Sequence, residues 1–205
     1  MKRNSLILLI FFFAWSACWA YSDELKNILA KTNTMQASFE QFIINKNYKN
    51  QSHTIGKIVL SRPNQFRWEV TSPNQQLIIA TSKQILIYDI DLEQITKNKV
   101  NLNQPDNPAM LLSGSLNTLD EMFEVTKINL PGAGNWFQLK PKKTNNSYQW
   151  IKLHFVNDEI IAMYVMDNLG QQIEINFENI ITNAKVPSST FTLKIPKNVD
   201  VIENS

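Results

Sequence analysis

The chain has 205 residues, of which 43% are hydrophobic and 19% are charged, and its formal net charge is +2. This length is enough for one sizeable domain with its own hydrophobic core. A chain so close to neutral lacks the clustered Lys and Arg side chains on which nucleic-acid binding depends, so we do not expect nucleic acid as a partner.

The first twenty residues are predicted to be a secretory signal peptide and not part of the fold. They begin with Lys and Arg and continue with an apolar run, Leu6–Trp15, that is too short to span a bilayer. Ala20, with the small Cys18 two residues before it, suits cleavage after Ala20. We therefore expect residues 1–20 to be removed and residues 21–205 to form a single exported domain.

Cys18 is the only cysteine of the chain. Its removal with the leader would leave no disulfide, no thiolate nucleophile and no cysteine metal site. In an alternative interpretation, Trp15–Cys18 is a lipoprotein acylation box and the chain is anchored through a lipid on Cys18. The bulky Trp15 stands where such a box usually has leucine, which argues against this alternative.

The sequence after the leader predicts one helix followed by strands. Apolar residues within Asp23–Asn33 have helical spacing, with Ser22 as the expected N-cap. Apolar and polar residues alternate from Met35 onward, which favours strands. The continuous apolar runs Leu77–Ala80 and Ile85–Tyr88 favour strands that are covered on both faces.

The segment Arg62-Pro63-Asn64-Gln65-Phe66-Arg67-Trp68 opens one of these strands with a proline that cannot continue a helix. Because strand side chains alternate, Phe66 and Trp68 are expected on one face and Arg67 on the other. Two large aromatic side chains beside the guanidinium of Arg62 give an apolar surface with polar donors at its rim. This combination suits the binding of an apolar ligand better than catalysis.

The middle of the chain interrupts the strands. A loop is expected at Gln104–Pro108, then a short apolar helix around Ala109–Leu112 and another helical turn at Leu119–Phe123. Hairpin turns are expected at Asn157-Asp158 and Asn168-Leu169-Gly170. The later strands are predicted at Val125–Asn129, Trp136–Lys140, Ile151–Val156, Ile160–Met166, Gln171–Ile180 and Phe191–Ile195.

A sheet with this many strands tends to curl or close. The predicted fold class is therefore α+β and mainly β. We expect a single strongly curved antiparallel sheet whose concave face is covered by a lid of two or three short α-helices.

No catalytic constellation is visible in the sequence. The two histidines, His53 and His154, are isolated, and the phosphate-loop, dinucleotide and Gly-x-Ser-x-Gly motifs are absent. The alternating acids Asp89, Asp91 and Glu93 lack the glycine and the terminal glutamate of a calcium loop. We therefore expect no enzymatic activity, no cofactor and no metal site, and a hydrolase is only a remote alternative.

Several segments carry a family resemblance through their order and spacing, namely Arg62–Trp68, Tyr88–Thr96, Pro108–Leu112, Phe191–Pro196 and Val199–Ile202. Together with the leader, they resemble the LolA family of lipoprotein carriers from the periplasm of Gram-negative bacteria. The resemblance spans Leu25 to Ile202. It implies a fold in which an antiparallel sheet forms an unclosed β-barrel with a helical lid.

The resemblance also implies a function. Such carriers accept triacylated lipoproteins from an inner-membrane ABC transporter of the LolCDE type and pass them to the outer-membrane receptor LolB. In this chain Arg62 would hold the lid through backbone carbonyls, and Phe66, with Trp68 on the same face, would line the cavity. Otherwise Arg62 is a solvated strand-edge charge and the two aromatics are ordinary core. The lid segment would contribute Met110, Leu111 and Leu112.

We expect the carrier to be a monomer whose cavity is shallow and adaptable. Two alternatives keep the same curved sheet. If Cys18 is lipidated, the chain is a receptor resembling LolB. If the cargo is a different one, the chain is a periplasmic module that binds or senses lipids.

Overall fold

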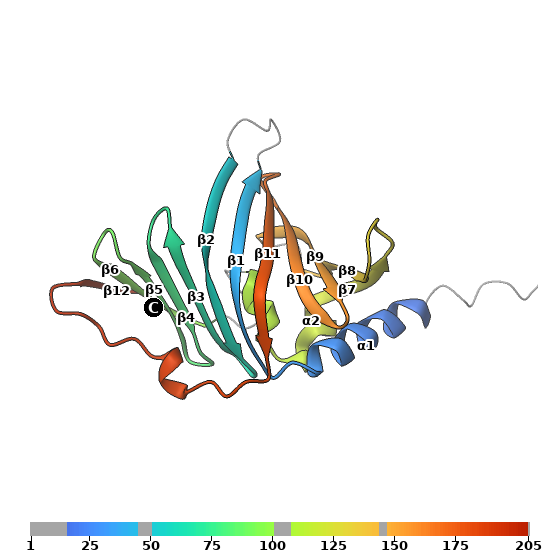
Figure 1. Cartoon of the computed structure of the whole chain (residues 1–205), viewed down its shortest axis with the longest axis horizontal. Helices are drawn as coiled ribbons and strands as arrows, with labels where there is room; N and C mark the ends of the chain where they lie inside the picture. Colours follow the sequence, from blue (N-terminus) through green and yellow to red (C-terminus); the bar gives the residue numbers. More distant parts are fainter. Residues whose placement is uncertain (1–15, 45–50, 101–107, 144–146, 205) are drawn as a thin grey trace, which may run out of the picture.

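The structure is a computed structural model that describes residues 16–44, 51–100, 108–143 and 147–204 (Figure 1). In this part of the chain, 12 strands form one continuous sheet in the order β12-β6-β5-β4-β3-β2-β1-β11-β10-β9-β8-β7. The strands are β1 (Thr34–Ile44), β2 (Gln51–Ser61), β3 (Gln65–Ser72), β4 (Gln76–Ala80), β5 (Gln84–Asp89), β6 (Gln94–Lys99), β7 (Phe123–Ile128), β8 (Asn135–Pro141), β9 (Tyr148–Val156), β10 (Glu159–Asp167), β11 (Gln172–Thr182) and β12 (Asp200–Glu203).

The predicted fold class is confirmed. The strands from β6 to β7 along this order pair in antiparallel fashion, whereas β12 pairs with β6 in parallel. The two edge strands of the sheet, β7 and β12, do not pair with each other, so the sheet curls without closing. The described helical elements are α1 (Ser16–Ala30), η1 (Pro108–Leu112), η2 (Leu116–Thr118), α2 (Leu119–Met122) and η3 (Ser188–Phe191), where η marks a 3₁₀ helix.

One face of the sheet packs against α1, η1 and α2 and is called the inner face. Its main core joins Leu25 of α1 and Leu112 of η1 with strand residues such as Phe39, Phe66 and Phe137. Residues 108–122, which comprise η1, η2 and α2, are called the lid below. The helical cover is therefore assembled from α1 and the lid, and η1 is a 3₁₀ helix rather than the α-helical turn expected from the sequence.

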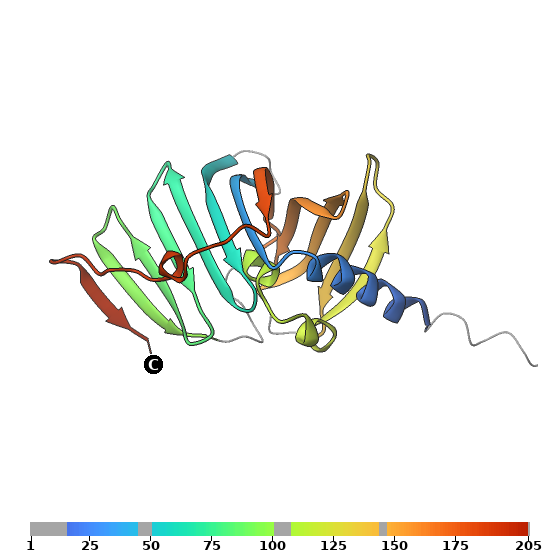
Figure 2. The same cartoon turned by 60° about the horizontal axis from the view of Figure 1, so that its bottom comes forward.

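The opposite, outer face carries a second core under the C-terminal segment. Phe191 packs there with Leu77, Ile79 and Leu86, and Figure 2 shows residues 183–199 running as a strap across strands β3 to β6. The inner face of the same strands meets the main core through Ala80. The prediction that β4 and β5 are covered on both faces is thus confirmed.

The N-terminal helix differs from its prediction. It begins at Ser16 instead of Asp23, and it ends at Ala30 instead of Asn33. The helix thus extends upstream into the predicted leader, although most residues between Ser16 and Ser22 have only intermediate helix propensity. Ser22 therefore lies inside the helix and cannot act as its N-cap, and its hydroxyl instead donates to the carboxylate of Asp120. Cleavage after Ala20 remains a prediction.

The predicted strand at Phe191–Ile195 is wrong. Ser188–Phe191 is a 3₁₀ helix, and the last strand is instead β12, which lies further along the chain. The alternation of Phe191 and Leu193 arises because both side chains pack on the outer face of the sheet, without a ladder of backbone hydrogen bonds. Apolar alternation reports burial on one side, and it does not by itself report strand pairing.

The hairpin turns are confirmed. Asn157 and Asp158, between β9 and β10, both have positive φ angles of 51° and 64°, as a two-residue hairpin turn requires. Gly170 has a φ of 80° in the turn between β10 and β11. The loop predicted at Gln104–Pro108 lies outside the described residues, except for Pro108, with which η1 begins.

Candidate functional site

Arg62 lies in the turn between β2 and β3 and connects two segments of the helical cover. Its Nε donates to the carbonyl oxygen of Thr32 at 3.1 Å, just after α1. Its Nη1 donates to the carbonyl oxygen of Gly114 at 2.7 Å, just after η1. A guanidinium has five donors in a planar fork, so one side chain can hold carbonyls from two separate segments.

The same turn makes a second bond to the lid. The backbone N–H of Asn64 donates to the carbonyl oxygen of Ser113 at 2.8 Å. Asn64 has a φ of 60°, a left-handed conformation that asparagine tolerates better than most residues. The turn therefore holds the η1 end of the lid through adjacent carbonyls, those of Ser113 and Gly114. We call this set of hydrogen bonds from Arg62 and Asn64 the Arg62 tie.

The charge of Arg62 is retained at neutral pH. Burial of the side chain lowers the pKa of its guanidinium to about 10, which is still well above 7. The group therefore donates charge-assisted hydrogen bonds, which are stronger than those between neutral partners. Its carbonyl acceptors follow helical segments, where carbonyl oxygens lack partners inside the helix.

Phe66 and Trp68 share the inner face, as the alternation predicted. Phe66 is 0% exposed and Trp68 is 3% exposed. The Trp68 ring stacks on Phe39, with 3.6 Å between ring centroids, and lies 6.1 Å from the Phe66 centroid. With the lid in place, both aromatics are packed as core residues. A role in lining a cavity for cargo remains a prediction for both.

The three lid residues singled out from the sequence differ in their surroundings. Leu111 and Leu112 are buried in the main core against the inner face. Met110 is only partly buried at the edge of this core and lines two separate cavities. Of the three, Met110 is therefore best placed to meet a ligand while the lid stays closed.

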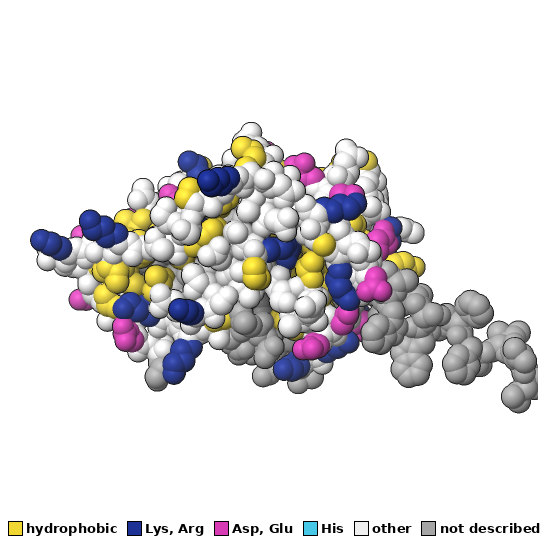
Figure 3. All heavy atoms as spheres, turned by 90° about the horizontal axis from the view of Figure 1, so that it is seen from below, with side chains coloured by type: hydrophobic (Ala, Val, Ile, Leu, Met, Phe, Trp, Pro, Cys, Tyr) yellow, Lys and Arg dark blue, Asp and Glu magenta, His cyan; other side chains and the backbone are white. Residues whose placement is uncertain are grey.

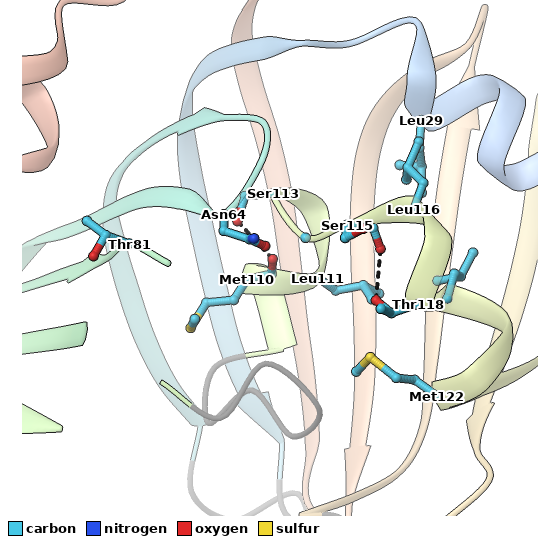
Figure 4. Close-up of a pocket in the computed structure, with 12 residues that line it drawn as sticks. Leu29, Asn64, Thr81, Met110, Leu111, Ser113, Ser115, Leu116, Thr118 and Met122 are labelled. Carbon is cyan, nitrogen blue, oxygen red and sulfur yellow. Dashed lines mark hydrogen bonds between the residues drawn. The ribbon is translucent and has the colours of Figure 1, made fainter. Parts of the chain in front are cut away.

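The smaller cavity lies along the lid and has a volume of about 70 Å³ (Figure 4). Figure 4 shows Met110 and Met122 approaching it from opposite ends of the lid, with Asn64 of the β2–β3 turn nearby. Methionine side chains are flexible and polarisable, so this lining can repack. The volume is too small for an acyl chain in the closed state.

The larger cavity lies between the inner face and η1, has a volume of about 270 Å³ and is called the apolar hollow below. Pockets for drug-sized ligands hold about 300–1,000 Å³. Three acyl chains therefore cannot enter the apolar hollow unless the lid moves. Its lining residues are Gln41, Ile78, Ile85, Ile87, Pro108, Met110, Ile173 and Ile175.

Most of this lining was not singled out from the sequence. The alternation of Ile173 and Ile175 with polar residues indicates that the two share one face of a strand. It does not indicate which other strands face them across the curved sheet. Gln41 follows Met35, Ala37 and Phe39 on the same face of its strand and interrupts their apolar series, a break that was not singled out from the sequence.

A second polar cluster holds the other end of the lid and was also missed. The carboxylate of Asp120, in α2, accepts hydrogen bonds from the Ser22 hydroxyl and the Lys26 ammonium, both in α1. Burial alone would raise the pKa of Asp120, but the hydrogen bonds from Lys26 and Ser22 outweigh it and hold the pKa below its ordinary value. Lys142 also donates to the Asp120 carbonyl oxygen at 2.5 Å.

The two histidines are not brought together. His53, in β2, stacks on Phe42 and lies 3.6 Å from the Glu40 carboxylate. His154, in β9, stacks on Trp136. Strands β1, β11 and β10 separate them. Among the residues that the structure describes, no three His, Cys, Asp or Glu side chains are grouped so that they could hold a metal ion.

The surface at the lid end carries mixed charges. Figure 3, the view from below, shows Lys and Arg scattered among Asp and Glu over this face. Apolar side chains gather at the end that holds β6 and β12, where Ile195, Val201 and Ile202 are exposed. Across the described residues, no helix is long and apolar enough to cross a bilayer.

Comparison with protein families gives one match over most of the chain. Residues 30–194 match the model of the family described as outer membrane lipoprotein carrier protein LolA. A Legionella pneumophila outer-membrane lipoprotein carrier protein is 34% identical over 203 residues, which cover 99% of this chain and 100% of the relative. One from Pseudomonas fluorescens is 33% identical over 179 residues, or 87% and 86% of the two chains.

Solved structures share the fold at low sequence identity. A LolA superfamily protein from Nitrosomonas europaea has a TM-score of 0.53 and 10% identity, with 86% of this chain and 98% of that chain covered. An uncharacterized conserved protein from Thermus thermophilus has a TM-score of 0.57 and 12% identity, with 89% and 99% covered. These likenesses support the unclosed sheet with its helical cover.

Proposed function

This chain belongs to the LolA family of outer-membrane lipoprotein carrier proteins, and we propose that it carries acylated lipoproteins through the periplasm. It would receive triacylated lipoproteins when an inner-membrane ABC transporter of the LolCDE type releases them. It would deliver them to an outer-membrane receptor of the LolB type. The protein would act as a monomer, without a cofactor and without catalysis, after removal of residues 1–20.

The observation that carries this proposal is the Arg62 tie, which holds a lid whose Met110 lines the apolar hollow. Arg62 holds the carbonyl of Gly114 and Asn64 holds that of Ser113, so this end of the lid is closed by a few directional hydrogen bonds. Each hydrogen bond to a charged group contributes about 1.5–3 kcal/mol. That amount favours a closed lid and is still small enough for bound cargo to shift the equilibrium toward an open one.

Carriage requires that burial of the acyl chains be incomplete. Each buried CH₂ contributes about 0.8 kcal/mol, so three chains of about sixteen carbons would release roughly 35–40 kcal/mol in total. Non-covalent affinities saturate near about 18–21 kcal/mol. A carrier that must release its cargo therefore covers the chains only in part. The small volume of the apolar hollow, about 270 Å³, and the flexible Met110 suit such partial coverage.

The closed state also explains how an empty carrier avoids exposing its apolar surface. Leu111 and Leu112 of the lid pack in the same core as Phe66 and Trp68. When the lid opens, the acyl chains of the cargo, and not water, would take the place of Leu111 and Leu112 in this core. The net change in buried apolar area is then smaller than the full burial of the chains, which keeps loading and release close to balance.

A release assay tests the proposal. Membrane vesicles that contain an acylated lipoprotein and its transporter are supplied with ATP and the purified protein. We expect the lipoprotein to appear in the soluble fraction as a one-to-one complex with the protein, and to pass to vesicles that carry the receptor. Lipoprotein that stays in the membrane regardless of the protein would contradict carriage.

Mass spectrometry of the native N-terminus separates carrier from receptor. A free N-terminus at Tyr21 supports the soluble carrier. A lipidated Cys18 would instead make the protein a membrane-anchored receptor, the alternative raised by the sequence Trp15–Cys18.

A further inference from the structure

Among the described residues, Gln41 supplies the one polar side chain that lines the apolar hollow. The other seven lining residues are isoleucines, a proline and a methionine. Gln41 lies in β1 on the inner face, where it pairs with Ile175 of β11 and with Thr54 of β2. An isoleucine or valine at this position would extend the apolar wall without interruption, so the amide needs a separate explanation.

The Gln41 amide has no hydrogen-bond partner among the side chains and backbone groups of the described residues. The group is half-buried, so water can serve it while the hollow is empty. A ligand that filled the hollow would displace this water. A buried amide without a partner costs free energy, so a purely hydrocarbon ligand would be penalised at this point.

Thr54 places a second polar group beside the amide. Directly opposed residues in an antiparallel pair point to the same face, with about 4.5–5.5 Å between their Cβ atoms. Gln41 and Thr54 are opposed in this way. The threonine hydroxyl is therefore a second donor next to the Gln41 amide, although Thr54 itself does not line the hollow.

We propose that Gln41, assisted by Thr54, donates hydrogen bonds to the acyl carbonyl oxygens of the cargo. This inference rests on the proposed function, because it assumes that the ligand is an acylated cysteine. In such a group, ester carbonyls join two chains to a glyceryl unit and an amide carbonyl joins the third chain to the amino group. These carbonyls are acceptors at the ends of long apolar chains.

Hydrogen bonds from Gln41 to the acyl carbonyls would make the hollow selective for acyl chains and would orient these chains within it. The carbonyl ends of the chains are held at the β1–β2 side, while the hydrocarbon lies against the isoleucines of β4, β5 and β11 and under Met110. A hydrocarbon of equal length without carbonyls binds less tightly, because it leaves the Gln41 amide unsatisfied. Discrimination by an unpaired polar group is stronger than discrimination by chain length alone.

The test compares two synthetic lipopeptides that differ only in the linkage of their chains. One carries palmitoyl chains in ester and amide linkage on its N-terminal cysteine, and the other carries alkyl chains in ether and amine linkage. We expect the wild-type protein to bind the acyl form about 5–50-fold more tightly. Gln41→Leu should bind both forms with equal affinity. Hybrids with only the esters or only the amide replaced show which carbonyl is read.

The matched control is Gln36→Leu, which changes the same residue type in the same strand on the outer face. It should keep the full preference of the wild type. Thr54→Val, which preserves shape and removes the hydroxyl, should reduce the preference in part. An apolar fluorophore should bind all variants as it binds the wild type, which confirms that their hollows are intact.

The outcomes distinguish this inference from the proposed function. If the wild type binds acyl and alkyl forms equally, or if Gln41→Leu keeps the preference, the role of Gln41 is wrong while carriage still holds. If neither lipopeptide nor the fluorophore binds the wild type, the proposed function itself fails.

Discussion

Arg62 donates its Nη1 hydrogen to the carbonyl oxygen of Gly114 at 2.7 Å, across 52 residues of sequence. The acceptor is a backbone atom, so the contact does not depend on the side chain at position 114. The donor is a charged group whose pKa is lowered by burial to about 10, so it stays protonated at neutral pH. The η1 end of the lid is therefore held by one charged side chain together with the backbone N–H of Asn64.

Replacing Arg62 by leucine should leave the protein folded but impair hand-over. Arg62→Leu removes two side-chain bonds of about 1.5–3 kcal/mol each, of which the one to Gly114 holds the lid directly. A less stable closed state favours the open, cargo-bound state, so the variant should accept lipoprotein and fail to pass it to receptor vesicles. The assay measures the cargo left on the carrier after incubation with those vesicles.

The control for that variant is Arg67→Leu. Arg67 lies in the same segment but points to the outer face, where it contacts Glu69 and the Thr190 carbonyl. The Arg67→Leu variant should transfer cargo normally. Normal transfer by Arg62→Leu would refute the role of the tie.

A charge in the apolar hollow should block loading. Ile173 is half-buried in the wall of the hollow, so Ile173→Asp places a carboxylate where acyl chains would lie. We expect binding of an apolar fluorophore to fall at least tenfold, with little loss of stability because the side chain can still reach water. Gln172→Asp, one residue earlier on the outer face, should bind the fluorophore as the wild type does. Equal binding by both variants would place the ligand elsewhere.

Asp120 should stabilise the joint between α1 and α2 in a pH-dependent way. Burial opposes its ionisation, but hydrogen bonds from Lys26 and Ser22 lower its pKa overall. A carboxyl with a lowered pKa in the folded state stabilises the protein above about pH 4 and loses this contribution as the pH falls through the folded pKa. Asp120→Asn should therefore lower the urea midpoint at pH 7, and the difference from wild type should shrink below pH 4.

The matched variant for Asp120 is Asp23→Asn. Asp23 contacts the same Lys26 at 3.2 Å, but it is exposed on the surface of α1. Exposed pairs of this kind contribute about 0–1 kcal/mol, so we expect almost no change in the midpoint. A pH-independent effect of Asp120→Asn would show that packing, and not charge, joins the two helices.

Gly56 should tolerate no larger residue, because the aromatic stack of the inner face lies against it. A Cβ at this position would lie 2.1 Å from the Glu69 carbonyl oxygen and 2.5 Å from the Phe39 ring. Gly56→Ala should therefore destabilise the protein by about 1–3 kcal/mol and disturb the stacking of Phe39 on Trp68. Urea unfolding followed by tryptophan fluorescence measures both effects.

Gly114→Ala is the comparison for Gly56. Its Cβ would come no closer than 3.4 Å to the Leu111 carbonyl oxygen, which is ordinary contact. The Gly114 carbonyl that accepts from Arg62 is retained, so stability and transfer should stay near those of the wild type. An unchanged midpoint for Gly56→Ala would mean that the strands can separate locally at little cost.

Much of the fold could be read from local patterns. Alternation placed Phe66 and Trp68 together on one face, and the turn residues Asn157 and Asp158 marked a hairpin with both φ angles positive. Such features depend on the sterics of neighbouring residues, which act wherever the segment lies. The same rules failed at Phe191, because burial under a strap produces the alternation of a strand without a partner strand.

Only part of the candidate site could be predicted from such local patterns. Arg62 could be singled out as a guanidinium beside aromatics, and the family resemblance gave it a role. Its acceptors, the carbonyls of Thr32 and Gly114, have no signature, because every residue carries a carbonyl. The place of Gln41 in the apolar hollow was hidden for a related reason, since alternation gives the face of a side chain but not its neighbours across a curled sheet.

The sequence by itself determined the mainly β class, most of the strands and the family, because these follow from side-chain alternation, turn chemistry and the order of a few motifs. Only the tertiary structure decided the parallel pairing of β12 with β6, the strap on the outer face and the lid held at both ends. These features depend on strand register and on the curvature of the sheet. The two lid contacts, for example, join groups that lie 52 and 98 residues apart in the sequence. A local sequence pattern cannot predict such a contact, because the contact depends on the packing of the whole sheet.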